Sequence, residues 1–500
     1  MLRTKDIKLQ FLGIIPQFSD PTGTLNPEQI AALSALLTFK GKSVKGLLQE
    51  TVAKGQDLAK KVRVILNKSS LRGHASVATT PTLAISFESS KFLDSMLTGM
   101  NFSSSLMASG RRTNTTCEDI VYPTAICANP KAKQIYQKQS EDNLECQNWL
   151  IEKGVAKDEA SKILQYGIYG TGIMVLPIES IVGFMREVEL EADWMPEEAK
   201  MLADWFAKNA KAWGIGQLLA TRRMAPRDIY PYPNIFKDPK KSNLAREAKK
   251  EIDCQLIISH QFKSKLKELL KLTKQISKDK KKILSDWQQL VSLRREICRD
   301  YNLNVSATIY SQPSWRVWGE KKRHRTVPQV VDSIYYSLEK AGEDKKNNWI
   351  SIPPTVKKNP EFLKRFLKCM NDSLVCYKKL LKMGIKPRDA LFVIPRGIRI
   401  NVIQKYDLYN LISGYYPTRL CTTVEEQLLQ MTRQEQSKLR QIFAKKKLAE
   451  LGEAIVVKCQ TSCFCHEEHP CSQIQSLVTD YDEEFHKQVL NNLEEKSLNL

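Results

Sequence analysis

The chain has 500 residues, and its 77 lysines and arginines exceed its 55 aspartates and glutamates, which gives a formal net charge of +22. A hydrophobic content of 42% excludes a globally disordered chain and is compatible with two to four domains. No run approaches the 18 apolar residues of a membrane span, and the N-terminus lacks the features of a signal peptide, so we expect a cytoplasmic protein with no membrane partner. The charge favours anionic ligands without choosing among nucleotides, flavin phosphates, folate polyglutamates and nucleic acid.

The first 240 residues alternate helix and strand signals. A helix is predicted to begin at Asn26-Pro27, where a proline stands near the first turn, and a second helix is predicted over 44–66. The segment 76–88 is rich in Thr, Val and Ile and predicts a strand, which Pro81 confines to an edge or a bend, and 89–109 predicts a helix. The later elements expected in this half are helices over 132–165 and 196–212 and a strand over 172–176.

A Lys-rich and largely helical segment separates this half from a second one. Its apolar stripe consists of Leu266, Leu269, Leu270 and Leu272. The stripe is typical of a solvated helical hairpin between domains, and a dedicated nucleic-acid arm is the alternative. Beyond it, a strand over 305–311, helices and an apolar run ending at Pro395 repeat the order of the first half, which indicates duplication of a domain. We therefore expect a first half over 1–240, a linker over 241–300, a second half over 301–450 and a Cys- and His-rich tail over 451–500.

Two groups of polar residues could carry chemistry. In the first half, His74 and Ser76 precede the predicted strand, and Ser104, Ser109 and Arg111 follow it. Hydroxyls and an arginine fork suit a phosphate, although a polar loop explains the same residues. In the second half, the triplet Arg323-His324-Arg325 follows two lysines. In so basic a chain, a solvated face or a nucleic-acid patch is an alternative for the triplet.

Taken in order, these motifs resemble the flavin-dependent thymidylate synthases, whose signature reads Arg-His-Arg-x-x-Ser-x-Asn-Glu-x-Ser-x-Arg-Tyr. Arg323, His324 and Arg325 match the flavin-contacting triplet of that family, and Ser333 matches a later position. In the first half the triplet is lost at 99–101, whereas the family's nucleotide-binding positions are matched by Ser104, Ser109 and Arg111. The resemblance implies that each half retains what the other has lost, so that one holds the flavin and the other the phosphate of dUMP.

The family also implies a fold and a reaction. The fold is α+β, with two tandem related α/β domains of the flavin-dependent thymidylate synthase type joined by a helical linker, in a homo-oligomer. The reaction methylates dUMP to dTMP with methylenetetrahydrofolate and NADPH as co-substrates, FAD as the cofactor and no Cys nucleophile. His74 and Ser76 are implied flavin contacts, and Arg419, which matches the family's late arginine, is the implied catalytic contact to the uracil base.

Several family positions are altered. The arginine of the family's Ala-Arg-x-x-Leu-Pro motif is Ser161 in the first half and Leu391 in the second, and the glutamine before the triplet is Glu320. These changes leave open a non-catalytic relative that binds flavin or nucleotide. A basic nucleic-acid-binding protein is a weaker alternative, because the sequence has no recognised nucleic-acid module and no basic-aromatic alternation.

Four of the twelve cysteines crowd into the tail. They are Cys459, Cys463, Cys465 and Cys471, and His466 and His469 lie among them. Thiolates and imidazoles at this density can close a tetrahedral zinc site. The spacing lacks the separated ligand pairs of common zinc motifs, so free thiols in a loop are the alternative.

Overall fold

The structure is a computed structural model that describes residues 1–20, 23–72, 74–108, 114–226, 228–248, 250–275, 280–462, 465, 467 and 471. The chain forms two compact units. The first comprises 1–247, 312–325 and 330–402, and the second comprises 248–311, 326–329 and the chain from residue 403. Within the described ranges, no helix combines the length and apolar character needed to cross a bilayer.

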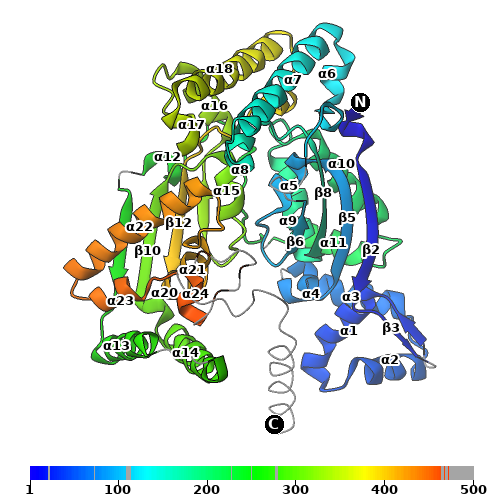
Figure 1. Cartoon of the computed structure of the whole chain (residues 1–500). Coiled ribbons are helices and arrows are strands. Elements are labelled where there is room, and N and C mark those ends of the chain that lie inside the picture. Colours follow the sequence, from blue (N-terminus) through cyan, green and yellow to red (C-terminus); the bar gives the residue numbers. More distant parts are fainter. Residues whose placement is uncertain are drawn as a thin grey trace. The chain divides into compact units, whose positions relative to one another are not determined.

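An antiparallel sheet forms the centre of the first unit (Figure 1). Its strand order is β2 (Lys8–Ile15), β5 (Thr82–Ser90), β8 (Tyr169–Pro177) and β6 (Ser104–Met107). In β5, the alternating side chains of Leu83, Ile85 and Phe87 are buried, as expected for a strand with one face on a core. Two small pairs add to this unit: β1 (Leu2–Arg3) with β7 (Val121–Tyr122), and β3 (Phe18–Asp20) with β4 (Gly23–Leu25).

Helix starts and stops in this unit follow local chemistry. Helix α1 (Pro27–Lys40) begins at Asn26 with a capping box, as predicted. The helix predicted over 44–66 is instead two, α2 (Val44–Ala53) and α3 (Leu58–Lys68), because Gly55 takes a left-handed φ of 57° and Asp57 caps α3.

Two further predictions near the first strand are corrected. The segment 76–88 begins within a short helix, α4 (Ala75–Thr79), and becomes β5 only from Thr82. The helix predicted over 89–109 is α5 (Lys91–Leu97) followed by β6, because Gly99, with a φ of 97°, turns the chain after α5. The remaining helices of the first half are α6 (Thr124–Ala128), α7 (Pro130–Glu152), α8 (Lys157–Ala160), α9 (Ile178–Leu190), α10 (Glu197–Asn209), α11 (Gly216–Met224) and α12 (Leu244–Glu247).

Two series of elements run in the same order. The first is α5, β6, α6, α7 and α8, with β7 inserted before α6. The second is α15 (Trp315–Lys321), β11 (Gln329–Val331), α17 (Pro354–Lys358), α18 (Pro360–Lys382) and α19 (Pro387–Ala390), with α16 (Ile334–Glu343) inserted before α17. Helices α7 and α18 have 23 residues each, and both begin at a proline after an asparagine cap, Asn129 or Asn359. Helices α8 and α19 both run into a 3-10 turn, 161–163 or 391–393. This shared order agrees with the predicted tandem relation, which stays a prediction.

The second unit has its own sheet and core. Strand β12 (Val402–Asp407) lies between β11 and β10 (Val305–Ser311), and β10 pairs antiparallel with β9 (Ile252–Leu256). The segment expected as a linker over 241–300 is largely part of this unit. It contributes β9 and two helices, α13 (His260–Lys274) and α14 (Lys280–Tyr301). Leu266 and Leu269 of the predicted stripe are buried in its core. The later helices are α20 (Leu408–Ile412), α21 (Tyr415–Arg419), α22 (Glu426–Lys445), α23 (Ala449–Ala454) and α24 (Lys458–Ser462).

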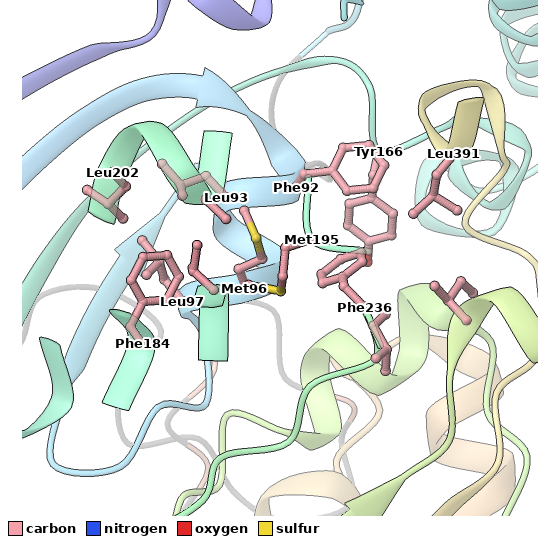
Figure 2. Packing of buried hydrophobic residues seen from close by; sticks show 14 of the residues in the cluster. Phe92, Leu93, Met96, Leu97, Tyr166, Phe184, Met195, Leu202, Phe236 and Leu391 are labelled. Atoms are coloured by element: carbon pink, nitrogen blue, oxygen red, sulfur yellow. The ribbon is translucent and has the colours of Figure 1, made fainter. Parts of the chain in front are cut away.

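The core of the first unit brings the two series together. Figure 2 shows Phe92 of α5 among side chains from several elements, including Tyr166 and Leu391. The ring of Phe92 lies 4.3 Å from that of Phe392 and 5.6 Å from that of Trp315, measured between centroids. Burial of large apolar side chains at such contacts is the main stabilising contribution to a fold. The combination of a central antiparallel sheet with helices agrees with the predicted α+β class.

Candidate functional site

The helix before the arginine triplet is anchored in the core of the first unit. Ser314 caps α15 by accepting a hydrogen bond from Val317 N, and Trp315 and Trp318 are fully buried. The indole Nε1 of Trp315 donates to Ser95 Oγ of α5 at 3.1 Å. This anchoring fixes the end of α15, so the turn that follows it projects the triplet from a rigid element.

The three side chains of the triplet have different environments. Arg325 is half-buried, and it donates from Nε to Met100 O at 3.0 Å and from Nη2 to Ser105 Oγ at 3.1 Å. Burial lowers the pKa of Arg325, and the charge of Arg323 lowers it further. Arg323 is exposed and His324 is half-buried. Arg325 therefore holds the turn in place, while Arg323 offers its guanidinium to an anion from solution.

A buried lysine stands directly before the triplet. Lys322 is 2% exposed, its ammonium donates to Ser95 O, and it lies 4.5 Å from the ring centre of Trp318. Burial lowers the pKa of Lys322 to about 7, against the opposing effect of Asp94, and the charges of Arg323 and Arg325 lower it further. The charged form of this lysine is therefore much less favoured than that of an exposed lysine.

Two more cations are buried in the same unit. Lys91 donates to Ala108 O at 3.1 Å, and burial, with the charge of Arg396 next, lowers its pKa to about 8. Arg396 donates from Nε to Gln165 O at 3.1 Å, and burial lowers its pKa to about 10. Within the described part of the chain, its Nη2 has no hydrogen-bond partner. Asp94 acts electrostatically on Lys91, Lys322 and Arg396, so one carboxylate opposes three buried cations and the region is electropositive.

The turns that follow α5 and α15 touch each other. A Cβ atom added to Gly99 would lie 3.1 Å from Lys322 O, and Gly99 holds a φ of 97° that side chains rarely adopt. Met100, next in the chain, accepts from Arg325. The turn after α5, where the resemblance places the lost triplet, is thus in contact with Lys322 and Arg325 of the turn after α15.

The two predicted residues before the first strand lie at a different place in the first unit. His74 and Ser76 are exposed at the start of α4, and both line a cavity of about 1240 Å³. The lining residues all come from 31–80, and five of them are lysines: Lys40, Lys54, Lys60, Lys61 and Lys68. The cavity is thus lined by basic and apolar side chains. The triplet at 323–325 is not among the residues that line it.

The predicted phosphate contacts are only partly described. Ser104 is exposed at the start of β6, whereas Ser109 and Arg111 lie outside the described residues. Ser333 is fully buried, and its hydroxyl caps α16 by accepting from Tyr335 N at 3.2 Å and donates to Lys237 O at 2.6 Å. Because both capacities of this hydroxyl are used within the fold, Ser333 has a structural role here.

The predicted catalytic arginine belongs to the second unit. Arg419 is half-buried at the end of α21. Glu425, six residues after Arg419, is fully buried and caps α22 by accepting from Leu428 N at 2.9 Å. In the first unit, Glu320 forms an ion pair with Arg316 at 3.1 Å, one turn earlier in α15. Both glutamates therefore have structural partners.

The zinc ligands predicted in the tail are not assembled as a metal site. Cys459 and Cys465 are buried, Cys471 is exposed, and Cys463 lies outside the described residues. Over the described part of the chain, no three side chains of His, Cys, Asp or Glu form a group that could hold a metal ion.

Comparison with known proteins places the triplet in a recognised sequence context. Residues 304–443 match the family model of the thymidylate synthase complementing protein. This part of the chain is therefore similar to that family. The chain is 29% identical over 99 residues to the flavin-dependent thymidylate synthase of Pyrococcus abyssi, and 29% identical over 89 residues to that of Thermococcus onnurineus. These matches cover 20% and 18% of this chain and 39% and 36% of the relatives, so the chain spans less than half the length of the curated relatives it matches.

A solved structure is also similar. It is a UMP/dUMP methylase, PolB, from Streptomyces cacaoi, bound with 5-Br dUMP. The sequence identity is 13%, the match covers 45% of this chain and 99% of that chain, and the TM-score is 0.34.

The thymidylate synthase complementing protein segment includes some of the candidate residues and omits others. Arg323, His324, Arg325 and Arg419 lie inside 304–443, and so does the buried Lys322. Lys91 lies outside it. Lys91, Lys322 and Arg396 cannot be recognised as site residues from the sequence, because a lysine or arginine in so basic a chain gives no sign of burial. The one available signal was that Lys322 directly precedes the triplet.

Proposed function

We propose that this protein is an FAD-dependent thymidylate synthase, which methylates dUMP to dTMP with methylenetetrahydrofolate as the carbon donor and NADPH as the reductant. The observation that carries the proposal is the triplet Arg323-His324-Arg325, which lies inside the family segment and is held by Arg325 against Met100 and Ser105. The proposal also includes a homo-oligomeric, cytoplasmic protein derived from a tandem duplication, which the shared order of the two series supports.

The donor set around the triplet fits an anionic flavin. When bound, reduced FAD supplies the hydride and carries negative charge near its N1 and C2 carbonyl. Arg323 and His324 would donate hydrogen bonds there, and Arg325 would hold the turn. The buried Lys91, Lys322 and Arg396 add positive potential from a region of low dielectric, where it acts more strongly than in water.

The remaining roles come from the family resemblance. Ser104, Ser109 and Arg111 would bind the phosphate of dUMP, because hydroxyls and a bidentate guanidinium match its oxygens. Arg419 would polarise the uracil carbonyl without covalent attack by a cysteine. His74 and Ser76, at the basic cavity, would add to the flavin or folate contacts. We leave Ser333 out of the proposed site because its hydroxyl caps α16.

Flavin content and dTMP formation test the proposal together. Purified protein should show flavin absorbance and should convert dUMP to dTMP when methylenetetrahydrofolate and NADPH are added. Arg325→Ala should lose most of the flavin, because it removes two hydrogen bonds of the turn. Arg433→Ala, at an exposed position of α22, is the matched control and should keep it. Equal flavin content in both variants would reject the assignment of the triplet.

A non-catalytic relative is the second candidate, and two observations favour it. Leu391, at a family arginine position, is fully buried in the apolar core, as Figure 2 shows. Ser161, at the other, is buried and donates to Asp158 O at 2.8 Å. Neither side chain can contact a nucleotide. Bound flavin and measurable dUMP binding with no dTMP formed would favour this candidate over the enzyme.

A further inference from the structure

A cavity of about 560 Å³ lies in the second unit, along one face of α14. Helix α14 packs against α20 and α24, which contribute further lining residues (Figure 1). Of the described residues that line this cavity, none belongs to the triplet or to the predicted substrate contacts. The cavity is therefore made of other residues than the site proposed above, and the inference drawn from it does not depend on the proposed function.

Helix α14 has two faces with different surroundings. Leu290, Leu293 and Ile297 are buried in the core of the second unit. A second row, with one residue at every fourth position, lines the cavity. Its members are Trp287, Val291, Arg295 and Arg299. Because residues four apart share one side of a helix, an indole and an isopropyl group stand in line with two guanidinium groups.

The charge of the cavity is positive. Three arginines line it, and none of its described lining residues is an aspartate or a glutamate. Arg294 is 5% exposed and donates from Nη1 to Ile412 O at 2.7 Å. Arg299 forms an exposed ion pair with its neighbour Asp300, of a kind that contributes little. Arg295 is exposed, and within the described part of the chain its guanidinium has no hydrogen bond or ion pair. Its donors are thus available to an anion in the cavity.

Tyr409, in the first turn of α20, supplies an aromatic ring with a fixed position. Its backbone N–H donates to Asn302 Oδ1 at 2.8 Å, and Asn302 Nδ2 donates to Asp407 Oδ2 at 2.9 Å. The ring lies against Gly414, where an added Cβ would be 2.6 Å from the ring atom Cε1. Tyr409 is nevertheless 40% exposed. Together with the half-buried Trp287, it gives the cavity two aromatic surfaces.

Aromatic surfaces beside arginines are suited to nucleotides. A base of any kind can stack on an aromatic ring, and a guanidinium binds phosphate oxygens through two parallel hydrogen bonds. The volume of about 560 Å³ lies in the range of small-molecule pockets. The chemistry of the lining and its size therefore agree on one class of ligand.

We propose that this cavity binds a nucleoside phosphate. Tyr409 and Trp287 would hold the base, and the guanidinium groups of Arg295 and Arg299 would hold the phosphate. Arg294 would add positive charge from a buried position, where solvent screens it less. A free nucleotide and one nucleotide of a single strand present the same base and phosphate, so the experiment has to distinguish these two sources.

Binding of GMP, fluorescently labelled on its ribose, to the full-length protein gives the main test. Arg295→Ala should weaken this binding by about 10-fold or more, the usual effect of losing a charge-assisted contact. Within the described residues the substitution removes no contact of the fold. Arg433→Ala, at an exposed position of α22 in the same unit, is the matched control and should bind like wild type. Arg325→Ala should also keep GMP binding, because the triplet does not line this cavity.

Competition by inorganic phosphate separates the base from the phosphate. Tyr409→Leu should weaken GMP binding by about 5- to 150-fold, the range measured for loss of base stacking, and leave phosphate binding unchanged. Arg295→Ala should weaken both. Tyr409→Phe retains the ring and should bind GMP like wild type, which guards against a folding defect in the leucine variant.

A single-stranded oligothymidylate of about ten nucleotides identifies the source of the ligand. If the ligand is part of a strand, this oligonucleotide should displace labelled GMP better than free GMP does, and its affinity should fall steeply with salt. If the ligand is a free nucleotide, GMP should be the stronger competitor. Either result supports the proposal. Three results would overturn it: wild-type protein that binds neither probe, unchanged GMP affinity in Arg295→Ala, or unchanged GMP affinity in Tyr409→Leu together with equally tight binding of inorganic phosphate.

Discussion

The turns after α5 and α15 share a frame and differ in chemistry. Both helices have seven residues and begin at a capping serine, Ser90 or Ser314. The first is followed by Thr-Gly-Met-Asn over 98–101, and the second by Lys-Arg-His-Arg over 322–325. The uncharged turn supplies a carbonyl and a glycine surface, and the charged turn rests on it. Two helices of the same length and cap are thus followed by one turn that supports and one turn that carries the charge.

Helices α7 and α18 likewise share their geometry and differ in their side chains. They have equal lengths and equivalent caps, yet they meet through different polar side chains. Ser373 Oγ donates to Asn143 Oδ1 at 2.9 Å, and Gln139 Nε2 donates to Ser373 Oγ at 3.3 Å, all in buried positions. A satisfied buried network of this kind fixes the register of two helices, because a slip would leave its members without partners. The two series are therefore locked to each other at their longest helices.

The largest expected effect comes from restoring a family residue where the fold no longer accepts it. Leu391→Arg would place a charge among fully buried apolar side chains such as Phe92 and Phe392. Burial of an unpaired charge is among the few changes that cost more than about 4 kcal/mol. We expect insoluble protein or loss of cooperative thermal unfolding, with Leu391→Met as the volume-conserving control. A soluble Leu391→Arg protein with enhanced dUMP binding would show that the position still faces the nucleotide.

The next effect tests the contact between the two turns. Gly99→Ala should destabilise the first unit for two reasons: the positive φ, which costs about 1–3 kcal/mol, and the approach of the new Cβ to Lys322 O. Gly154→Ala is the matched control, because Gly154 has a φ of 87° and open space around its Cβ direction. Thermal unfolding should show a larger loss for Gly99→Ala, and flavin content should fall in that variant alone. Equal losses would mean that the turns do not depend on each other.

The buried Lys322 predicts a particular pH dependence. Its pKa falls to about 7 in the fold, whereas an unfolded lysine has a pKa of about 10.4. Between these values the unfolded chain binds a proton that the folded protein has released, so the stability contributed by this group rises with pH, by up to about 1.4 kcal/mol per pH unit. Below pH 7 the lysine is charged in both states and its burial is an uncompensated cost.

Unfolding measured from pH 6 to pH 9.5 tests this dependence. Lys322→Met should be more stable than wild type at low pH and should show a smaller rise with pH, while Lys91 retains part of the slope. The exposed Lys131→Met is the control and should follow wild type. Parallel pH profiles for all three proteins would show that Lys322 keeps its charge throughout.

The sequence predicts what is local and misses what is distant. The start of α1 follows from Asn26 and the residues just after it, and strand β10 follows from its own composition. The break between α2 and α3 was missed because Gly55 gives no sign of its backbone angle before the chain is folded.

The same limit applies to the candidate site. The triplet was found by identity and order. The burial of Lys322 depends on Ser95, and that of Arg396 on Gln165, which are far away in sequence. The contact between Cys421 and Glu467 likewise joins residues that are far apart in the sequence. Chemistry that rests on such contacts cannot be predicted from a single sequence.

The smallest expected effect distinguishes a cap from a ligand. Ser333 was predicted to contact substrate, but its hydroxyl caps α16 in the same way that Ser314 caps α15. Ser333→Ala should therefore cost about 1 kcal/mol of stability, the usual value for a lost serine cap, and leave dUMP affinity unchanged. Ser314→Ala should cost a similar amount and also reduce flavin content, because α15 carries the triplet and α16 does not. Because both variants remove a serine cap, comparing them separates the effect on helix stability from the effect on ligand binding. If Ser333→Ala weakened dUMP binding while thermal stability stayed the same, Ser333 would be a substrate contact after all, and the second series would retain nucleotide-binding as well as flavin-binding positions.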